Sequence, residues 1–251
     1  MRLDKFLSEK YGSRAKAVAA IKGGLVLLNG KTCAPSYEVK KTDKFEFLQA
    51  KENFVSAGGF KLSKAIKDFA FSVKDKIFAD IGASTGGFTD CLFQNGAKKV
   101  YCIDVGESQL DKTLFDKNIV VIDNFNARNL TRDLFYEKLD GVVIDVSFIS
   151  LTYILEAVCN LIENGANVIA LIKPQFECES RNVGKNGIVK DAETHKRIIE
   201  KIYNFAVSIN LAPIGVTNAP IITGKNKEYL ILLEKSGKPV DFKNLLKFVK
   251  L

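Results

Sequence analysis

The sequence is poor in the residues that build a metal site, and it has no stretch that would build a membrane span. It contains one histidine, His195, and five cysteines without a Cys-x-x-Cys pair. A metal site is therefore not expected, and dispersed cysteines within apolar runs are typical of reduced thiols in a cytoplasmic protein. The most apolar long window, 141–160, is interrupted by Asp145 and Glu156, which excludes a membrane-spanning helix there.

A signal for export is also missing. Residues 1–12 mix charged and apolar side chains at helical spacing and contain no continuous apolar core. We therefore expect a cytoplasmic protein with no membrane partner. With 251 residues and 47% hydrophobic composition, the chain can form one large domain and a small one.

Acidic residues are scarce near the N-terminus. Residues 1–50 hold ten Lys/Arg and five Asp/Glu, a net charge of +5, whereas the other 201 residues hold 27 and 24, a net charge of +3. One fifth of the chain thus carries most of the positive charge. This asymmetry indicates a polyanion-binding module attached to a second domain.

Residues 77–90 have the pattern of an apolar strand, a glycine-rich turn and the start of a helix. Gly82, Gly86 and Gly87 follow a G-x-x-x-G-G order, which differs from the dinucleotide pattern G-x-G-x-x-G. Glycines let the backbone approach a ligand, and the helix start offers free N–H groups. Asp80 disfavours a pyrophosphate there and favours a ligand with an amine and a sulfonium, such as S-adenosylmethionine. The alternative is a tight turn without a ligand.

A second strand, 99–104, ends in Asp104, which lies 22 positions after Gly82 and could accept the two ribose hydroxyls of a nucleoside. Dinucleotide sites and adenosylmethionine sites share such an acid, so it indicates a nucleoside without deciding between them. The predicted cofactor contacts are Asp80, Gly82, Ala83, Ser84, Gly86, Gly87, Phe88, Asp104, Asp123 and Asn124.

The rest of the second domain alternates short apolar runs with helix-length segments. The runs, rich in β-branched residues, are 100–103, 119–122, 141–144 and 168–172. This alternation predicts an α/β fold with a parallel sheet covered on both faces. Two more runs, 212–216 and 229–233, predict a terminal antiparallel pair.

Residues 1–50 predict a small α+β domain. A helix is expected from its N-cap Ser13 to Lys22, with an inward face made of Ala15, Val18, Ala19 and Ile21. Asn29-Gly30 predicts a hairpin turn, and a closing strand is expected at 45–48.

This order, together with Arg2-Leu-Asp-Lys-Phe-Leu, Ser13-Arg-Ala-Lys-Ala and Gly24-Leu-Val-Leu-Leu-Asn-Gly-Lys31, resembles the alpha-L RNA-binding domain of the ribosomal protein S-four type. The domain is placed at 1–50, a linker at 51–56 and the second domain at 57–251. The resemblance implies that a basic helical face and the hairpin edge bind folded RNA, whereas the alternative is a solvated lysine face. The implied phosphate contacts are Arg2, Lys5, Arg14, Lys16, Lys22 and Lys31.

Charged residues lie at several predicted strand ends, which is where open α/β sheets bind ligands. Asp145 ends the run 141–144, Lys173 ends 168–172, and Glu228 enters the last strand. Lys61 begins a helix before the glycine-rich turn. Together they form a Lys-Asp-Lys-Glu set.

The second domain resembles the FtsJ-like ribose 2′-O-methyltransferases, and nearly the whole chain resembles the TlyA (hemolysin A) group of rRNA methyltransferases. The matching stretches are Asp80-Ile-Gly-Ala-Ser-Thr-Gly-Gly-Phe-Thr-Asp90, Asp145-Val-Ser-Phe-Ile-Ser-Leu151, Lys173-Pro-Gln-Phe-Glu177 and Lys227-Glu228. The resemblance implies a Rossmann-like class I methyltransferase sheet, S-adenosylmethionine as cofactor and ribosomal RNA as partner. It also implies that Lys61, Asp145, Lys173 and Glu228 are catalytic.

A ribose 2′-hydroxyl is a poor nucleophile, so it must be aligned with the methyl group and lose its proton as the new bond forms. Lys173, buried beside another cation, is predicted to be the base, and Asp145 to hold its amine and face the sulfonium. Lys61 and Glu228 would orient the acceptor. Residues 176–190 predict a substrate loop, mobile without RNA, in which Lys185 contacts RNA.

Two departures from the family pattern put particular RNA contacts in doubt. Ala57 stands where the family often has arginine, and Ala219 stands where it usually has serine. Neither changes the expected reaction.

Three other functions remain as alternatives: a non-catalytic ribosome-assembly factor, a secreted hemolysin, and a DNA or small-molecule methyltransferase. The complete Lys-Asp-Lys-Glu set argues against the first, and the missing signal and span argue against the second. Val-Ser-Phe after Asp145, in place of an Asn/Asp-Pro-Pro-Tyr stretch, argues against the third.

The expected target is a cytidine of 23S rRNA within the assembled large subunit. The resemblance implies that longer family members act on both subunits and shorter ones on the large subunit alone. This chain starts on the alpha-L motif and stops after one short helix, 241–250, which fits the shorter kind.

Overall fold

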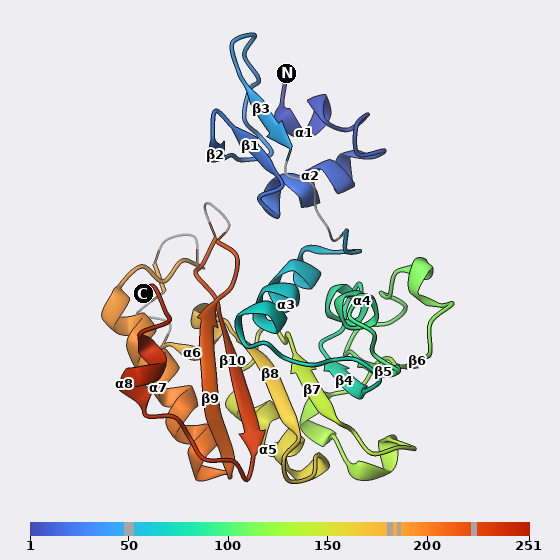
Figure 1. The fold of residues 1–251 in the computed structure, drawn as a ribbon, viewed down its shortest axis with the longest axis vertical. Coiled ribbons are helices and arrows are strands. Elements are labelled where there is room, and N and C mark those ends of the chain that lie inside the picture. Colours follow the sequence, from blue (N-terminus) through green and yellow to red (C-terminus); the bar gives the residue numbers. More distant parts are fainter. Residues whose placement is uncertain (48–52, 180–182, 185–186, 222–224) are drawn as a thin grey trace.

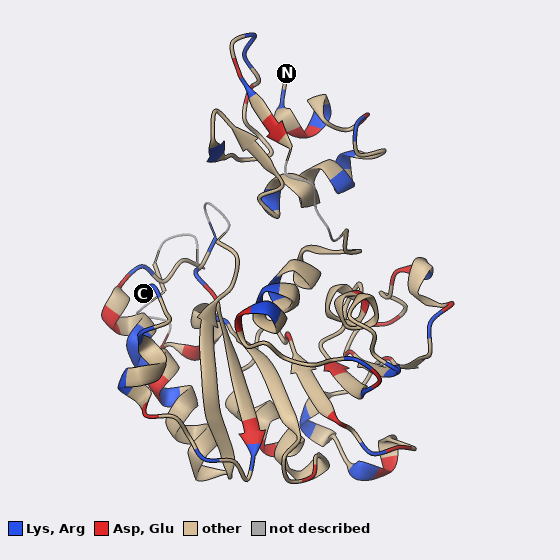
Figure 2. Ribbon diagram, viewed as in Figure 1, with Lys and Arg blue, Asp and Glu red and all other residues tan. Residues whose placement is uncertain are grey.

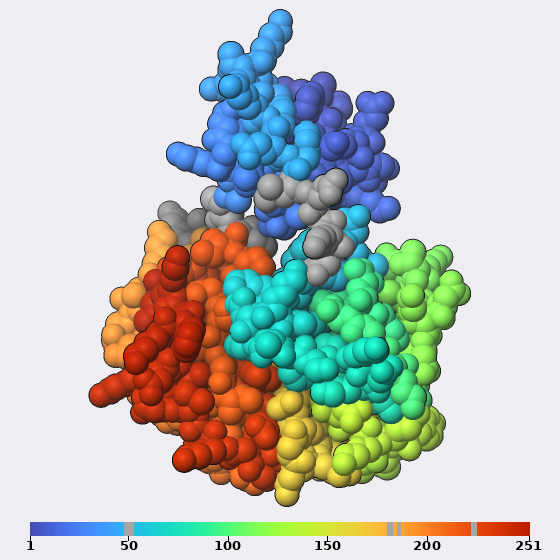
Figure 3. Space-filling view, viewed as in Figure 1, coloured from blue at the N-terminus to red at the C-terminus, as the bar shows by residue number. Residues whose placement is uncertain are grey.

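The computed structural model describes residues 1–47, 53–179, 183–184, 187–221 and 225–251. A small N-terminal domain lies on the side of the larger domain's sheet where the parallel strands end (Figure 1). The space-filling view shows it as a separate body above the larger one (Figure 3). The two touch where α2 ends, since a Cβ added at Gly23 would lie 3.3 Å from the ring of Phe60.

The small domain contains α1 (Leu3–Phe6), α2 (Arg14–Lys22) and an antiparallel sheet of order β2-β1-β3. Its strands are β1 (Val26–Leu28), β2 (Lys31–Thr32) and β3 (Phe45–Phe47). Ser13 Oγ accepts a hydrogen bond from Lys16 N at 3.1 Å, which confirms the predicted helix cap. Asn29 and Gly30 both have positive φ angles, +51° and +75°, as a tight hairpin turn requires.

The predicted inward face of α2 is right for Ile21 and wrong for Ala15, which is exposed. The buried residues are Ala17, Ala20 and Ile21, and Ala17 and Ile21 pack with Leu3 and Val26. Alanine occurs on every side of this helix, so the sequence carries little contrast between its faces.

The large domain has a seven-stranded sheet of order β6-β5-β4-β7-β8-β10-β9. The strands are β4 (Ile77–Ile81), β5 (Lys99–Ile103), β6 (Ile119–Ile122), β7 (Gly141–Ile144), β8 (Asn167–Ile172), β9 (Leu211–Asn218) and β10 (Tyr229–Lys235). Strands β4 to β8 pair in parallel, and β10 lies antiparallel between β8 and β9. The predicted parallel sheet and terminal antiparallel pair are therefore confirmed.

Helices cover both faces of this sheet. One face packs on α3 (Ala57–Asp68) and α4 (Gly87–Gln94), and the other packs on α5 (Thr152–Leu161) and α7 (Ala192–Ser208). The shorter elements are η1 (Lys112–Leu114), η2 (Ala127–Asn129), η3 (Arg132–Leu134), α6 (Pro174–Glu177) and α8 (Phe242–Leu246). No helix in these described ranges is long and apolar enough to cross a membrane.

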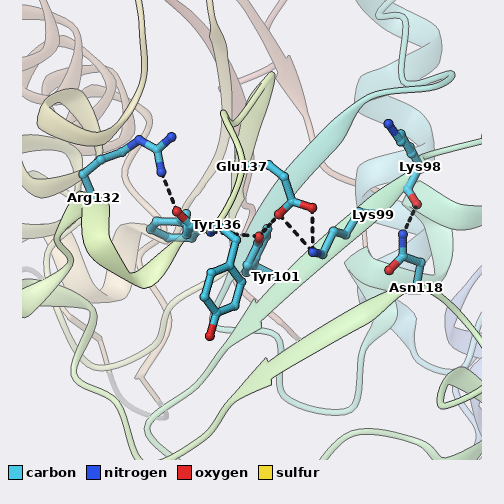
Figure 4. Close-up of polar contacts among 8 residues, drawn as sticks. Lys98, Lys99, Tyr101, Asn118, Arg132, Tyr136 and Glu137 are labelled. Carbon is cyan, nitrogen blue, oxygen red and sulfur yellow. Dashed lines mark hydrogen bonds and ion pairs between the residues drawn. The ribbon is translucent and has the colours of Figure 1, made fainter.

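The strands begin at the edge opposite the glycine-rich turn, where polar contacts hold the connection to β7 (Figure 4). Glu137 accepts hydrogen bonds from Lys99 Nζ at 2.8 and 2.9 Å and from the hydroxyl of buried Tyr101. That hydroxyl in turn accepts from Tyr136 N at 3.1 Å. These contacts fix the segment before β7 against β5, and thereby the position of Asp145 at the other end of β7.

Candidate active site

The sheet order reverses at β4, and the turn after this strand approaches the end of β7 closely. Gly82 has φ +82°, and a Cβ placed on it would lie 2.7 Å from the carbonyl oxygen of Asp145. Gly86 has φ +88°, and its Cβ would lie 2.4 Å from Leu114. A side chain at either position would therefore force this turn apart, which explains the glycines in the motif.

A pocket of about 180 Å³ lies over this turn. Five of the predicted cofactor residues line it: Gly82, Ala83, Ser84, Gly87 and Phe88. Ser56 and Gly58 close it from the start of α3, and Asp145, Ser147 and Lys173 close it from the neighbouring strand ends. The glycine-rich turn thus shares one pocket with two of the four predicted catalytic residues, Asp145 and Lys173.

Asp104 lies at the end of β5, beside this turn. Its carboxylate accepts hydrogen bonds from Ser84 N and Gly106 N, both at 2.8 Å, and each oxygen keeps a further lone pair. It is therefore held in place and can still accept hydroxyl groups. Ser84 Oγ also donates a hydrogen bond to Gln109 Oε1 at 3.2 Å, and nothing in the sequence indicates a role for Gln109.

The last two residues of the predicted cofactor set, one acid and one amide, lie further out. Asp123 follows β6 and accepts from Ser108 N at 2.8 Å, and Asn124 is exposed with φ +55°. Neither lines the pocket over the turn.

Asp80 lies beneath the turn and does not line the pocket. Its side chain is fully buried, and Thr89 Oγ donates to its Oδ2 at 2.6 Å. Burial, together with the Asp145 and Asp104 carboxylates, raises the pKa of Asp80 to about 7, although the Thr89 hydrogen bond opposes this. Any effect of Asp80 on a ligand is therefore electrostatic and comes from below the turn.

The predicted catalytic residues form two ion pairs. Lys173 Nζ lies 2.6 Å from Asp145 Oδ1, off the directional axis of a hydrogen bond, and donates to Ser147 Oγ at 2.8 Å. Lys61 Nζ lies 2.7 Å from Glu228 Oε2. The sequence argument expected a second cation beside Lys173; instead, each lysine has its own carboxylate.

A second pocket of about 630 Å³ adjoins the first. Lys61, Glu228 and Lys173 line it, together with the aromatic residues Phe148 and Phe176. Ser147 and Lys173 border both pockets. The structure therefore brings all four predicted catalytic residues together around the junction of two pockets.

Sequence reasoning gave no role to Phe148 or Glu177, although both lie in the stretches that carry the family resemblance. Phe148 is 90% exposed, has φ +65° and lies against Phe176, with ring centroids 5.1 Å apart. Glu177 is buried and accepts from Leu151 N at 2.6 Å and Ser150 Oγ at 2.7 Å. Glu177 also pairs with Lys201 of α7 at 3.2 Å.

A larger cavity of about 960 Å³ lies between α3, β9 and α8, with mostly apolar walls. It contains none of the predicted catalytic residues. We therefore place the candidate site at the strand ends, where the chemical groups converge, and not at the larger cavity.

The predicted RNA contacts of the small domain lie at its surface: Arg2, Lys5, Arg14, Lys16, Lys22 and Lys31, of which Lys22 is half-buried. Arg2 and Arg14 both pair with buried Asp4, at 2.9 and 3.0 Å. Figure 2 shows further lysines along α3 of the large domain. Lys185 lies outside the described residues.

Comparison with known families agrees with this site. Residues 54–235 match the FtsJ-like methyltransferase family, and residues 1–45 match the S4 domain. The chain belongs to the FtsJ-like methyltransferase family and carries an S4 domain at its N-terminus.

Relatives match nearly the whole chain. Hemolysin A of Brachyspira hyodysenteriae is 42% identical and covers 92% of this chain and 98% of its own. The 16S/23S rRNA (cytidine-2′-O)-methyltransferase TlyA of Mycobacterium tuberculosis is 35% identical, covering 88% and 84%. The 23S rRNA (cytidine-2′-O)-methyltransferase TlyA of Campylobacter jejuni is 34% identical, covering 76% and 82%.

A solved structure has the same fold. A protein from Streptococcus thermophilus, provisionally assigned as a hemolysin, is 36% identical, has a TM-score of 0.75 and covers 98% of this chain and 94% of its own. The resemblance thus includes both domains.

Proposed function

We propose that this chain is an S-adenosylmethionine-dependent rRNA (cytidine-2′-O)-methyltransferase. The observation that carries the proposal is the junction of two pockets at Lys173, whose amine lies between Asp145 on the cofactor side and the larger pocket on the other. Membership of the FtsJ-like family and the names of the relatives agree with this activity.

The residues present fit S-adenosylmethionine. Glycine at position 82 lets the turn lie directly against the backbone of Asp145, so that the two walls of the cofactor pocket meet, and buried Asp80 has an oxygen without a hydrogen-bond donor among the described residues. The turn residues and Ser84 would hold the amino-acid part, and Asp104 the ribose. When bound, the cofactor supplies a methyl group on a sulfonium.

Lys173 is proposed as the base. Its amine would take the proton of the 2′-hydroxyl as the acceptor oxygen forms its bond to carbon. Asp145, 2.6 Å away, keeps the amine at the junction, and Ser147 fixes its direction. The Lys61–Glu228 pair, which also lines the larger pocket, would position the ribose.

The larger pocket suits a nucleotide turned out of its RNA. Phe148 and Phe176 offer aromatic faces next to Lys173, and proteins stack unpaired bases on such faces. The basic surface of the small domain would hold the surrounding RNA. An rRNA substrate supports a location in the cytoplasm, where ribosomes assemble.

Large-subunit RNA is the proposed target, because the names of both TlyA relatives include 23S rRNA. A non-catalytic assembly factor or a hemolysin is not favoured, since residues 54–235 match the FtsJ-like methyltransferase family. We further propose that the assembled large subunit is the substrate.

The test is methyl transfer to separated, unmodified ribosomal subunits and to free 23S rRNA, with Lys173→Ala as the inactive control. We expect labelling of the large subunit at a cytidine 2′-hydroxyl. Equal labelling of both subunits would contradict the large-subunit preference, and better labelling of free RNA would contradict the assembled substrate. No labelling of any RNA would contradict the function itself.

A further inference from the structure

Asp80 has an incomplete set of hydrogen bonds. It is fully buried, and Thr89 Oγ donates to Oδ2, but Oδ1 receives no hydrogen bond in the described part of the chain. Burying an ionised carboxylate without full compensation is costly. The arrangement is therefore unfavourable for the charged form unless a positive charge is placed nearby.

The groups around Asp80 are mainly acidic. Asp104 from the end of β5 and Asp145 from the end of β7 both raise its pKa, to about 7 in total with burial as the main cause. Cys102 meets Thr89 Oγ at 3.1 Å, and burial raises the pKa of this thiol, so it stays neutral. Lys173 is the cation of this region, and its charge is already balanced by Asp145 at 2.6 Å.

We propose that Asp80 makes the cofactor pocket select ligands by charge: in mildly acidic solution it keeps a proton when the pocket is empty or holds the demethylated product, and it ionises when a sulfonium lies above the turn. This inference rests on the proposed function. S-adenosylmethionine carries one positive charge more than S-adenosylhomocysteine, because methyl transfer turns the sulfonium into a neutral thioether. In a buried site this difference of one charge has a strong effect on a neighbouring carboxyl.

Proton release follows from this arrangement. If the free protein holds the proton and its S-adenosylmethionine complex does not, lower pH favours the free protein and weakens binding. The limiting change is about tenfold in affinity per pH unit below pH 7. Affinity for S-adenosylhomocysteine should change much less, since the amino groups of both ligands stay protonated in this range, with α-amino pKa values of about 8.

The experiment is titration calorimetry of the full-length protein with each ligand at pH 5.5, 6.0, 6.5 and 7.0. Two buffers of different ionisation enthalpy report the number of protons released. We expect S-adenosylmethionine to release more than half a proton at pH 6.0, and S-adenosylhomocysteine to release clearly fewer. Sinefungin, which carries an ammonium where the sulfonium stands, should behave like S-adenosylmethionine.

Two variants and a control connect the effect to Asp80. Asp80→Asn should abolish the extra proton release and make the ratio of the two affinities independent of pH. Thr89→Val keeps the carboxyl but removes its donor, so the midpoint of proton release should move to higher pH. Asp140→Asn, at the opposite end of β4, where the carboxylate accepts from Ile77 N, should behave like the wild type.

The outcomes are distinguishable. Binding of S-adenosylmethionine without net proton release, or with the same release as S-adenosylhomocysteine, would overturn the inference and leave the proposed function intact. An unchanged midpoint in Thr89→Val would also overturn it, even if Asp80→Asn failed to fold. Absence of any S-adenosylmethionine binding would overturn the proposed function as well.

Discussion

The two domains each bury an aspartate, and the two aspartates have opposite surroundings. Asp4 of the small domain is 2% exposed and forms ion pairs with Arg2 and Arg14. Hydrogen bonding to Arg2, first of all, holds the pKa of Asp4 far below its usual range. Asp80 of the large domain has no cationic partner among the causes of its pKa shift: burial and the Asp145 and Asp104 carboxylates raise its pKa to about 7, against hydrogen bonds from Thr89.

The difference shows how each domain uses charge. In the small domain the acid organises two arginines whose side chains are 47% and 59% exposed and remain available to a polyanion. In the large domain, carboxylates are turned inward, toward pockets that suit a positively charged ligand. A buried acid therefore orders surface arginines in one domain and lies beneath the cofactor turn in the other.

The largest expected effect tests whether the inward charges of the large domain are catalytic. Lys173→Ala should reduce methyl transfer by about 10²–10⁴-fold, because a positioned base contributes that much. Binding of S-adenosylmethionine, measured by calorimetry, should survive. Lys64→Ala, which breaks an ion pair with Asp68 on the same side of the molecule, is the matched control. Near-normal turnover of Lys173→Ala would remove this residue from the mechanism.

The second prediction concerns stability, because folding shifts the pKa values of Asp80 and Asp4 in opposite directions. Folding raises the pKa of Asp80, so this carboxyl stabilises the protein at low pH and loses that contribution as the pH rises through about 7. Folding lowers the pKa of Asp4, so Asp4 does the reverse and loses its contribution on acidification. Asp80→Asn should therefore raise the unfolding free energy of the ligand-free protein at pH 8, by up to about 4 kcal/mol.

Denaturant unfolding at pH 5 and pH 8 measures this change, with Asp140→Asn as the control. The stabilisation by Asp80→Asn should be less than half as large at pH 5, because the contribution of Asp80 is lost progressively between its unfolded pKa of about 4 and its folded pKa of about 7. An equal change in stability at both pH values would contradict the raised pKa.

The smallest expected effect concerns the surface that Asp4 organises. Asp4→Asn should weaken binding to rRNA by roughly tenfold and flatten its dependence on salt, since two phosphate contacts lose their orientation. Cofactor binding should not change. Glu9→Gln, an exposed acid of the same domain, is the control for the loss of one negative charge. If both variants bind RNA equally, Asp4 has no special role.

The strand-end residues could be predicted because parallel strands end at one edge of a sheet. This rule alone predicts that Gly82, Asp104, Asp145 and Lys173 lie close together. The burial of Asp80 could not be predicted, because both faces of β4 are covered and its residues alternate between two buried layers. An acid in such a strand therefore gives no indication of whether it points toward ligand or core.

Contacts between distant segments were also beyond sequence reasoning. Ser147 and Glu177 lie in motifs that were recognised, but their partners are 26 to 27 positions away along the chain. The buried face of α2 could not be predicted either. Alanine occurs on every side of this helix, so only tertiary packing decides that Ala17 is buried and Ala15 is not.

Glu177 ties together the loop after β7, the turn after β8 and, through Lys201, helix α7. Asp145 and Lys173 are carried by the two segments that this single carboxylate joins. The distance between Asp145 and Lys173 is therefore set when the domain folds. No further entropy has to be lost to bring these two side chains together in each catalytic cycle. Any opening of the site for RNA has to come from the other walls of the larger pocket, with the Asp145–Lys173 pair as the fixed point around which they move.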